Sequence, residues 1–406
     1  MELADVPVVL MLVGLAAYAV LAGADFGAGF WQLVGGRGDR DRELREHAHH
    51  AMGPVWEANH VWLIFVLVVC WTAYPTAFAS IMSTLAVPLF LAGVGIILRG
   101  TAYALRSGTA TAREQRRVEV ALAASSILTP FALGTSIGGI ASGRVPVGNA
   151  AGDLATSWLN ATSILVGALA VATAAYLAAV YLAADAVRLR RPALARAFRV
   201  RALAMAVVAG ALAVAGLAVV HEDARSIWDG LTSGSGLSAV IVSGLAGLGT
   251  VLLVLQRRYE LARVSAALAV VAIVAGWGLA QRPELLPGLT IQEAAAGHSV
   301  LVSVVVALAI GAVILVPSLG LLFSLVLRGR FDEERVVDAE RKIAAAGGNE
   351  RLLRAAALCL VVGVVVTVVP ESPWGRIVGI PALLAFIALG FVALARAMTA
   401  AAGDDA

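Results

Sequence analysis

Charged residues are scarce in this chain. Asp, Glu, Lys and Arg make up only 14% of its 406 residues, whereas apolar residues make up 60%. The mean hydropathy is +0.89. In soluble globular proteins about a quarter of all residues are charged, so a soluble enzyme or binding domain is excluded. Long uncharged runs throughout the sequence predict instead an all-α polytopic membrane protein.

Cysteine is almost absent. The two cysteines, Cys70 and Cys359, fall inside apolar runs and form no Cys-x-x-Cys pair, which excludes a disulfide framework and a cysteine-based metal site. The six histidines include no pairs at facing positions of predicted helices, as a bound haem would need. Three of them, His47, His49 and His50, precede the second predicted span beside charged residues, where we expect a solvated face.

Basic residues form no single patch. The net charge is +3, but Lys and Arg are spread over the connections between apolar runs, so nucleic acid is not an expected partner. With the N-terminus outside, 26 of the 30 Lys and Arg residues lie on the cytoplasmic side, all except Arg144, Arg225, Arg282 and Arg376. The positive-inside rule therefore predicts an N-out, C-in topology with an odd number of spans. The first residues lack a basic region, so no cleaved signal peptide is expected.

Eleven apolar runs approach the length of about 20 residues that a membrane helix needs. They cover residues 8–33, 52–74, 77–105, 118–141, 158–184, 202–221, 237–255, 261–279, 299–326, 353–369 and 377–394. The first eight divide into two four-helix bundles, with peripheral helices after them. Pro88, Pro130 and Pro317 lie within spans and are expected to kink them.

Three regions follow from this organisation. Residues 1–330 form the main membrane domain. Residues 331–352 carry mixed charges and include a Gly-Gly pair at 347–348, which predicts an amphipathic segment on the cytoplasmic surface. Residues 353–406 contain an additional helix pair and a short tail.

Two acids lie within the first two predicted spans. Asp25 stands among glycines and alanines about ten residues, or roughly 15 Å, before the cytoplasmic end of the first span. Glu57 is about five residues, or roughly 8 Å, inside the second span from the same boundary. Ionisable residues inside a membrane are costly and indicate a functional site.

Other polar residues surround these acids. Helical spacing places Glu57 on one face with His60, and Asn59 on one face with Trp56 and Trp62. Arg99, late in the third span, is a plausible counter-charge for one of the acids. Such a group could pass protons from the cytoplasm, with Glu57, Asp25 and Asn59 as the path.

The alternative is purely structural. Asp25, Glu57 and Arg99 would then form a polar clasp between helices, and Trp56 and Trp62 would belong to an interfacial aromatic belt. His60 is the only intramembrane imidazole, and haem ligation by this residue alone is disfavoured.

These residues carry a resemblance to a known family. The sequence GPVWEANHVW at residues 53–62 resembles the Gly-Pro-x-Trp-Asp-Gly-Asn-x-Val-Trp motif of subunit II of cytochrome bd-type quinol oxidases. ADFGAGF at residues 24–30 is similar to the end of a second motif of that family. Similarity continues through residues 73–75, 98–100, 231–232, 289–291 and 316–318, and it covers about residues 1–330.

The resemblance implies a haem-free subunit in a bacterial-type cytoplasmic membrane. Its partner, subunit I, would carry b- and d-type haems and oxidise quinol while dioxygen is reduced to water. Small accessory subunits, membrane lipid and a structural quinone are further expected partners. In the family the acid of the second span is associated with proton delivery, and that role carries over to Glu57, with Trp56, Asn59 and Trp62 as its matching neighbours.

Some positions depart from the family pattern. Glu57 replaces Asp, Ala58 replaces Gly, and Ala22 stands where the first motif has another Asp, which indicates a divergent member. A different class remains open, because a stand-alone transporter or ion translocator could use Asp25 and Glu57 at a substrate site. A structural membrane scaffold is the third possibility.

Overall fold

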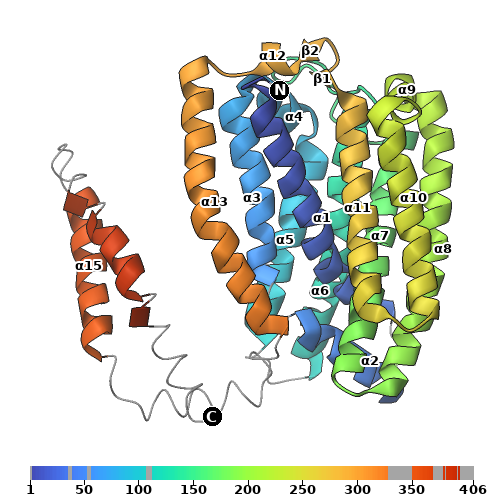
Figure 1. The fold of residues 1–406 in the computed structure, drawn as a ribbon, viewed down its shortest axis with the longest axis horizontal. Helices are drawn as coiled ribbons and strands as arrows, with labels where there is room; N and C mark the ends of the chain where they lie inside the picture. Colours follow the sequence, from blue (N-terminus) through green and yellow to red (C-terminus); the bar gives the residue numbers. More distant parts are fainter. Residues whose placement is uncertain are drawn as a thin grey trace. The chain divides into compact units, whose positions relative to one another are not determined.

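The chain is almost entirely helical, as the sequence predicts. Figure 1 shows the computed structural model, which describes residues 2–34, 39–52, 56–106, 112–327, 350–368, 378–379, 381–390 and 392–393. It divides into two units, Met1–Ala312 and Val313–Ala406. The predicted amphipathic segment at 331–352 falls mostly on residues 328–349, outside the described residues. The boundaries of the three predicted regions therefore stay predictions.

The described elements follow one another along the chain. They are α1 (Asp5–Val34), α2 (Asp39–Met52), α3 (Trp56–Ala73), α4 (Pro75–Thr84), α5 (Ala86–Arg106), α6 (Ala112–Ala141), α7 (Ala161–Arg188), α8 (Pro192–Asp223), α9 (Arg225–Leu231), α10 (Gly234–Leu255), α11 (Tyr259–Gln281), β1 (Glu284–Leu286), β2 (Leu289–Thr290), α12 (Ile291–Ala294), α13 (His298–Leu327) and α15 (Glu350–Val368). The two short strands pair antiparallel as a hairpin.

Eight of the described helices are long and apolar enough to cross a membrane: α1, α5, α6, α7, α8, α10, α11 and α13. Shorter apolar helices at Asn59–Ala73, Arg354–Gly363 and Pro381–Gly390 fall inside the three other predicted spans. The chain is therefore a multi-pass membrane protein. The count of eleven spans and the orientation stay predictions.

The third predicted span is broken rather than kinked. Residues 77–105 are divided at Leu85, between α4 and α5. Pro88 has no backbone N–H, so it cannot donate to the carbonyl of Thr84 four residues earlier. That carbonyl oxygen instead accepts a hydrogen bond from the Ser157 hydroxyl at 3.4 Å. The break is stabilised by this long-range contact, which the local sequence does not reveal.

Predicted external segments meet at one end of the first unit. The Tyr74 hydroxyl, at the α3–α4 junction, donates to the carbonyl of Ala4 beside the N-terminus. The Ala296 amide, which follows the hairpin, donates to the Ala73 carbonyl at 2.8 Å. Figure 1 shows the N-terminus, the hairpin and α9 at the same end, opposite α2. The segments predicted to be external therefore lie together at one end of the first unit, and the side of the membrane on which this end lies stays a prediction.

The helices pack in two groups that match the predicted division. In the first group α1 contacts α3 and α6, and α5 contacts α6. In the second group α7 contacts α8 and α11, and α10 contacts α11. The groups meet where α1 and α6 both pack against α7. Alanines of α7 dominate the core at this junction.

The α1–α7 contact is close because small residues form it. A side-chain carbon at Gly27 would overlap the carbonyl oxygen of Ala174 and lie 2.7 Å from the Cβ of Ala178. One turn later, the Trp31 indole N–H donates to the Ala175 carbonyl at 2.8 Å. Small residues allow helix backbones to approach in this way inside membranes. Gly27 is therefore required for the position of α1.

Substitution of Gly27 tests this packing. Gly27→Ala should lower the free energy of unfolding by about 1–3 kcal/mol, because the added methyl overpacks the interface. The control is Gly210→Ala in α8, where nothing lies within 4 Å of the added carbon. Chemical unfolding in detergent micelles would measure both variants. Equal stability of the two variants would contradict the close-contact interpretation.

The prediction of a solvated loop before the second span is wrong for His47. Residues 39–52 form helix α2, which packs against α7. The His47 ring is buried and its Nε2 lies 3.0 Å from the carbonyl oxygen of Leu182. Since a carbonyl only accepts, Nε2 must carry the proton. The reason for the error is that amphipathic packing against α7 cannot be read from local charge. The side chains of His49 and His50 lie outside the described residues.

Burial lowers the pKa of His47 below its ordinary value of 6.5, and the positive charge of Arg191 acts in the same direction. The hydrogen bond to Leu182 and the charges of Asp185 and Glu43 oppose this shift but do not cancel it. The folded state therefore binds fewer protons than the unfolded state below pH 6.5.

Stability should accordingly fall as the pH drops from 6.5 towards the lowered pKa of the folded protein. His47→Gln keeps an N–H donor for the Leu182 carbonyl but does not titrate. Melting temperatures across this pH range should fall more steeply for the wild type than for the variant. Parallel curves would show that His47 does not contribute to the pH dependence.

Candidate functional site

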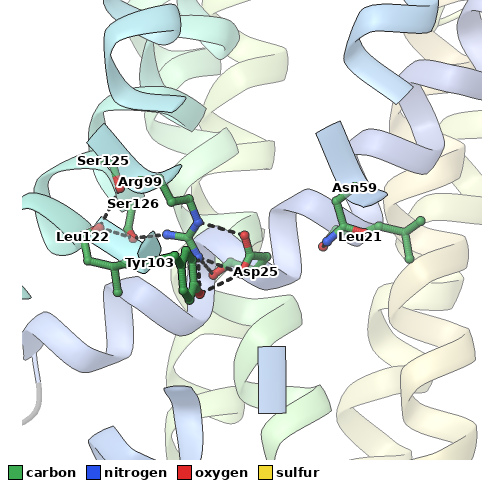
Figure 2. A network of polar contacts seen from close by, with 8 residues as sticks. All are labelled: Leu21, Asp25, Asn59, Arg99, Tyr103, Leu122, Ser125 and Ser126. Atoms are coloured by element: carbon green, nitrogen blue, oxygen red, sulfur yellow. Dashed lines mark hydrogen bonds and ion pairs between the residues drawn. The ribbon is translucent and has the colours of Figure 1, made fainter. Parts of the chain in front are cut away.

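A buried ion pair joins α1 to α5. Figure 2 shows the Arg99 guanidinium facing the Asp25 carboxylate. Nε lies 2.8 Å from Oδ2, and Nη2 lies 2.7 Å from Oδ1 and 2.8 Å from the Asp25 carbonyl oxygen. Both side chains are 0% exposed. This bidentate geometry is the strongest form of arginine–carboxylate pairing.

Neighbouring groups complete the coordination of Arg99. Its Nη1 donates to the Ser126 hydroxyl on α6 at 2.9 Å, and that hydroxyl donates onward to the Leu122 carbonyl at 2.6 Å. The Phe26 ring centroid lies 4.9 Å from the guanidinium carbon. A side-chain carbon at Gly29 would lie 3.0 Å from the Cβ of Ser126 and 3.1 Å from Nη1. Glycine at position 29 therefore leaves room for the ion pair.

The pair is electrically balanced and excluded from solvent. Burying one of these charges alone would cost several kcal/mol, and only the bidentate contact and the extra hydrogen bonds offset that cost. The sequence predicted Arg99 as a counter-charge for one of the two acids, and the structure pairs it with Asp25. Asp25 is consequently held by one partner at both carboxylate oxygens.

Asn59 and His60 lie on α3, facing α1. The Asn59 side-chain amide donates to the Leu21 carbonyl at 3.3 Å, one turn before Asp25 (Figure 2). The His60 ring packs edge-on against Tyr18 and Phe26, each at 5.9 Å between centroids. The structure therefore brings Asn59 and His60 beside the helix that carries Asp25.

Two buried polar atoms in this region have no hydrogen-bond partner among the described residues. They are the Tyr18 hydroxyl and the Oδ1 of Asn59. Buried polar atoms of this kind are where proteins hold ordered water. Both atoms belong to residues of the α1–α3 interface.

The structure describes the side chain of Trp62 but only the backbone of Trp56 and Glu57. Trp62 is partly buried and packs against the cluster of Tyr18, Ala22 and Phe26. Glu57 is the second residue of α3 and Trp56 the first, but their side chains lie outside the described residues. The backbone therefore puts Glu57 at the amino end of a helix, where a carboxylate is stabilised.

Sequence reasoning missed three residues of the site: Tyr18, Tyr103 and Ser126. Helical periodicity could have found two of them, since Tyr18 precedes Asp25 by seven residues and Tyr103 follows Arg99 by four. The Tyr103 hydroxyl lies 3.4 Å from Asp25 Oδ1. Ser126 could not be found, because the register of α6 against α5 is a tertiary property.

No group of three or more His, Cys, Asp or Glu side chains gathers in the part of the chain that the structure describes. His60 faces aromatic rings, and the Nε2 of His47 is used by a backbone carbonyl. The described contacts of this region instead hold α1 against α3, α5 and α6.

Comparisons with known proteins agree with the sequence resemblance. A family model for cytochrome bd terminal oxidase subunit II matches residues 3–326. The solved structure of bd oxidase from Geobacillus thermodenitrificans is similar, with a TM-score of 0.64 and 26% identity. That match covers 82% of this chain and 100% of the compared chain.

Two curated relatives match over shorter stretches. Cytochrome bd ubiquinol oxidase subunit 2 of Bacillus subtilis (strain 168) is 26% identical over 133 residues, 33% of this chain and 38% of the relative. Cytochrome bd-I ubiquinol oxidase subunit 2 of Escherichia coli (strain K12) is 27% identical over 135 residues, 33% and 35% respectively. The matched stretches thus span little more than a third of these relatives.

Removal of one partner tests the ion pair. Arg99→Met should lower the free energy of unfolding by about 3–5 kcal/mol, because Asp25 would be left as an uncompensated buried charge. Asp25→Leu combined with Arg99→Met should be more stable than Arg99→Met alone. Denaturant unfolding of Asp25→Leu, of Arg99→Met and of the double variant measures the coupling energy between the two side chains. Strictly additive losses would show that the two groups do not interact energetically.

Proposed function

This chain belongs to the cytochrome bd terminal oxidase subunit II family, and we propose that it works as the haem-free subunit of a quinol-oxidising, oxygen-reducing complex. The match to the family over residues 3–326 carries the proposal. Support also comes from the structural similarity to bd oxidase, which extends over the whole of the compared chain. The complex would reside in a bacterial cytoplasmic membrane.

The partner would be subunit I, which we expect to hold the b- and d-type haems. Those haems supply the electron transfer from quinol to dioxygen. This chain would pack against the haem subunit and provide polar groups at the interface between the two subunits. Small accessory subunits and a structural quinone are further proposed partners.

Reduction of dioxygen to water consumes protons, and we assign part of their delivery to this chain. Glu57 would take up protons at the amino end of α3, near the predicted cytoplasmic boundary. Asn59 lies two residues further along, and its Oδ1, like the Tyr18 hydroxyl on α1, is buried without a hydrogen-bond partner among the described residues. These groups support a hydrated path between α1 and α3.

Asp25 would have a positioning role in this path. Both of its carboxylate oxygens accept hydrogen bonds from Arg99, so its protonation would leave a buried guanidinium without a counter-charge. The pair fixes α1 at the level where Asn59 contacts the Leu21 carbonyl. Glu57 is then the proton carrier, and Asp25 with Arg99 holds the helix that lines the path. The same pairing leaves Asp25 poorly suited to a transporter's substrate site.

Replacement of Glu57 tests this assignment. In the purified complex, Glu57→Gln should slow quinol-dependent oxygen consumption by about 100-fold, the usual scale for loss of a proton-transferring group. The haem absorption spectrum should stay as in the wild type. Glu57→Asp retains the carboxyl group and should keep most of the rate.

Glu119→Gln is the matched control, since Glu119 is an exposed acid on α6 in the same bundle. It should not alter the turnover. Full turnover of Glu57→Gln with intact haems would assign Glu57 to a structural clasp. Absence of any haem-bearing partner after gentle purification would instead refute the oxidase assignment itself.

A further inference from the structure

Two turns on the α2 side of the first unit share one unusual geometry. They join α7 to α8 and α10 to α11, and both lie at the lower end of the view in Figure 1. Arg190 has a φ of 55° and Arg257 a φ of 61°. In each turn the next residue closes the helix, since Arg191 donates to the Ala186 carbonyl at 2.8 Å and Arg258 to the Leu253 carbonyl at 2.9 Å. This is the Schellman pattern.

Glycine normally occupies the left-handed position of this motif, because a side chain is disfavoured there. The chain has 41 glycines, yet both turns carry arginine at that position. The positive-inside rule explains why basic residues are frequent on this side of the membrane. It does not explain why arginine occupies the left-handed position of each turn. The fold therefore does not account for arginine at these two positions.

The two turns are rich in uncompensated positive charge. Residues 185–201 and 256–263 contain nine arginines but only two acids, Asp185 and Glu260. Asp185 pairs with Arg263 at 2.5 Å, and Glu260 lies 3.5 Å from the same arginine. The four arginines of the turns themselves have no acidic partner among the described residues; they are Arg190, Arg191, Arg257 and Arg258.

A hollow of about 210 Å³ lies at the turn between α10 and α11, and two of these arginines, Arg257 and Arg258, line it. It is lined by Ala184 and Val187 of α7 and by residues 257–261, and its wall is mostly apolar. Val187 and Leu261 are 51% and 54% exposed. An apolar wall at the end of membrane helices, rimmed by free guanidinium groups, is complementary to an amphiphile with an anionic head.

We propose that this arginine-rimmed hollow binds the phosphate headgroup of an anionic phospholipid, with Val187 and Leu261 against its acyl chains. Guanidinium groups bind phosphate in a bidentate manner, which suits a site of this kind. A lipid is favoured over an acidic protein segment because the hollow lies where helices of the membrane domain end and its wall is apolar. The proposal does not depend on the oxidase assignment.

The turn geometry allows a test that should not damage the fold. Arg190→Gly and Arg257→Gly remove the charges but place glycine where the backbone prefers it. Binding of phosphatidylglycerol to the purified complex would be measured by native mass spectrometry, with phosphatidylcholine as the neutral comparison. Arg257→Gly should weaken phosphatidylglycerol binding about fivefold, the effect of one basic residue at a membrane surface. Arg190→Gly, whose side chain does not line the hollow, should weaken it less.

Two further variants sharpen the result. Glu260→Gln removes a negative charge from the rim and should strengthen binding of phosphatidylglycerol. Arg117→Ala removes an exposed arginine from α6 in the first bundle and should leave phosphatidylglycerol binding unchanged. The melting temperature of the lipid-free glycine variants should equal or exceed that of the wild type.

Several outcomes would overturn the proposal. These are unchanged phosphatidylglycerol binding in the double glycine variant, equal affinity of the wild type for phosphatidylcholine, or equally strong binding of inorganic phosphate alone. Loss of a co-purifying protein from the glycine variants, with lipid binding intact, would assign the hollow to an acidic protein segment instead.

Discussion

The buried contact between Asp25 and Arg99 is the interaction on which the first helix bundle depends. Neither group is exposed, so each charge is tolerated only because the other lies within 3 Å of it. Ser126 and the Phe26 ring complete the surroundings of the guanidinium. The pair therefore fixes α1 relative to α5 and α6, and any polar path along α1 inherits its position from this contact.

The same helix is held on its other side by close packing and by the hydrogen bond from the Trp31 indole to the Ala175 carbonyl. Gly27 allows α1 to approach the backbone of α7, two residues after the acid that pairs with Arg99. One short segment, residues 25–31, thus carries both the electrostatic and the steric contacts that place α1 between the two bundles. Movement of this segment would disturb the site and the junction together, which explains why small residues surround the acid.

The sequence predicted the class of protein, the apolar runs and Arg99 as a counter-charge for one of the two acids, because hydropathy and the cost of a lone buried charge are local properties. It did not predict Ser126 as a partner of Arg99 or the break at Leu85, since both depend on contacts between distant helices. His47 was misassigned for the same reason: its neighbours in sequence are charged, but its neighbours in space are α7 and Phe198. Glu57 was identified by its motif, and its role is still a proposal.

A fixed acid at Asp25 and a titrating acid at Glu57 have different spectroscopic signatures. Infrared difference spectra of the purified complex, recorded between its oxidised and reduced states, report carboxyl groups that gain or lose a proton. A carboxyl band that is present in the wild type and vanishes in Glu57→Gln is the expected result. A band that persists unchanged in Glu57→Gln would contradict it, because the proton would then reside on another acid.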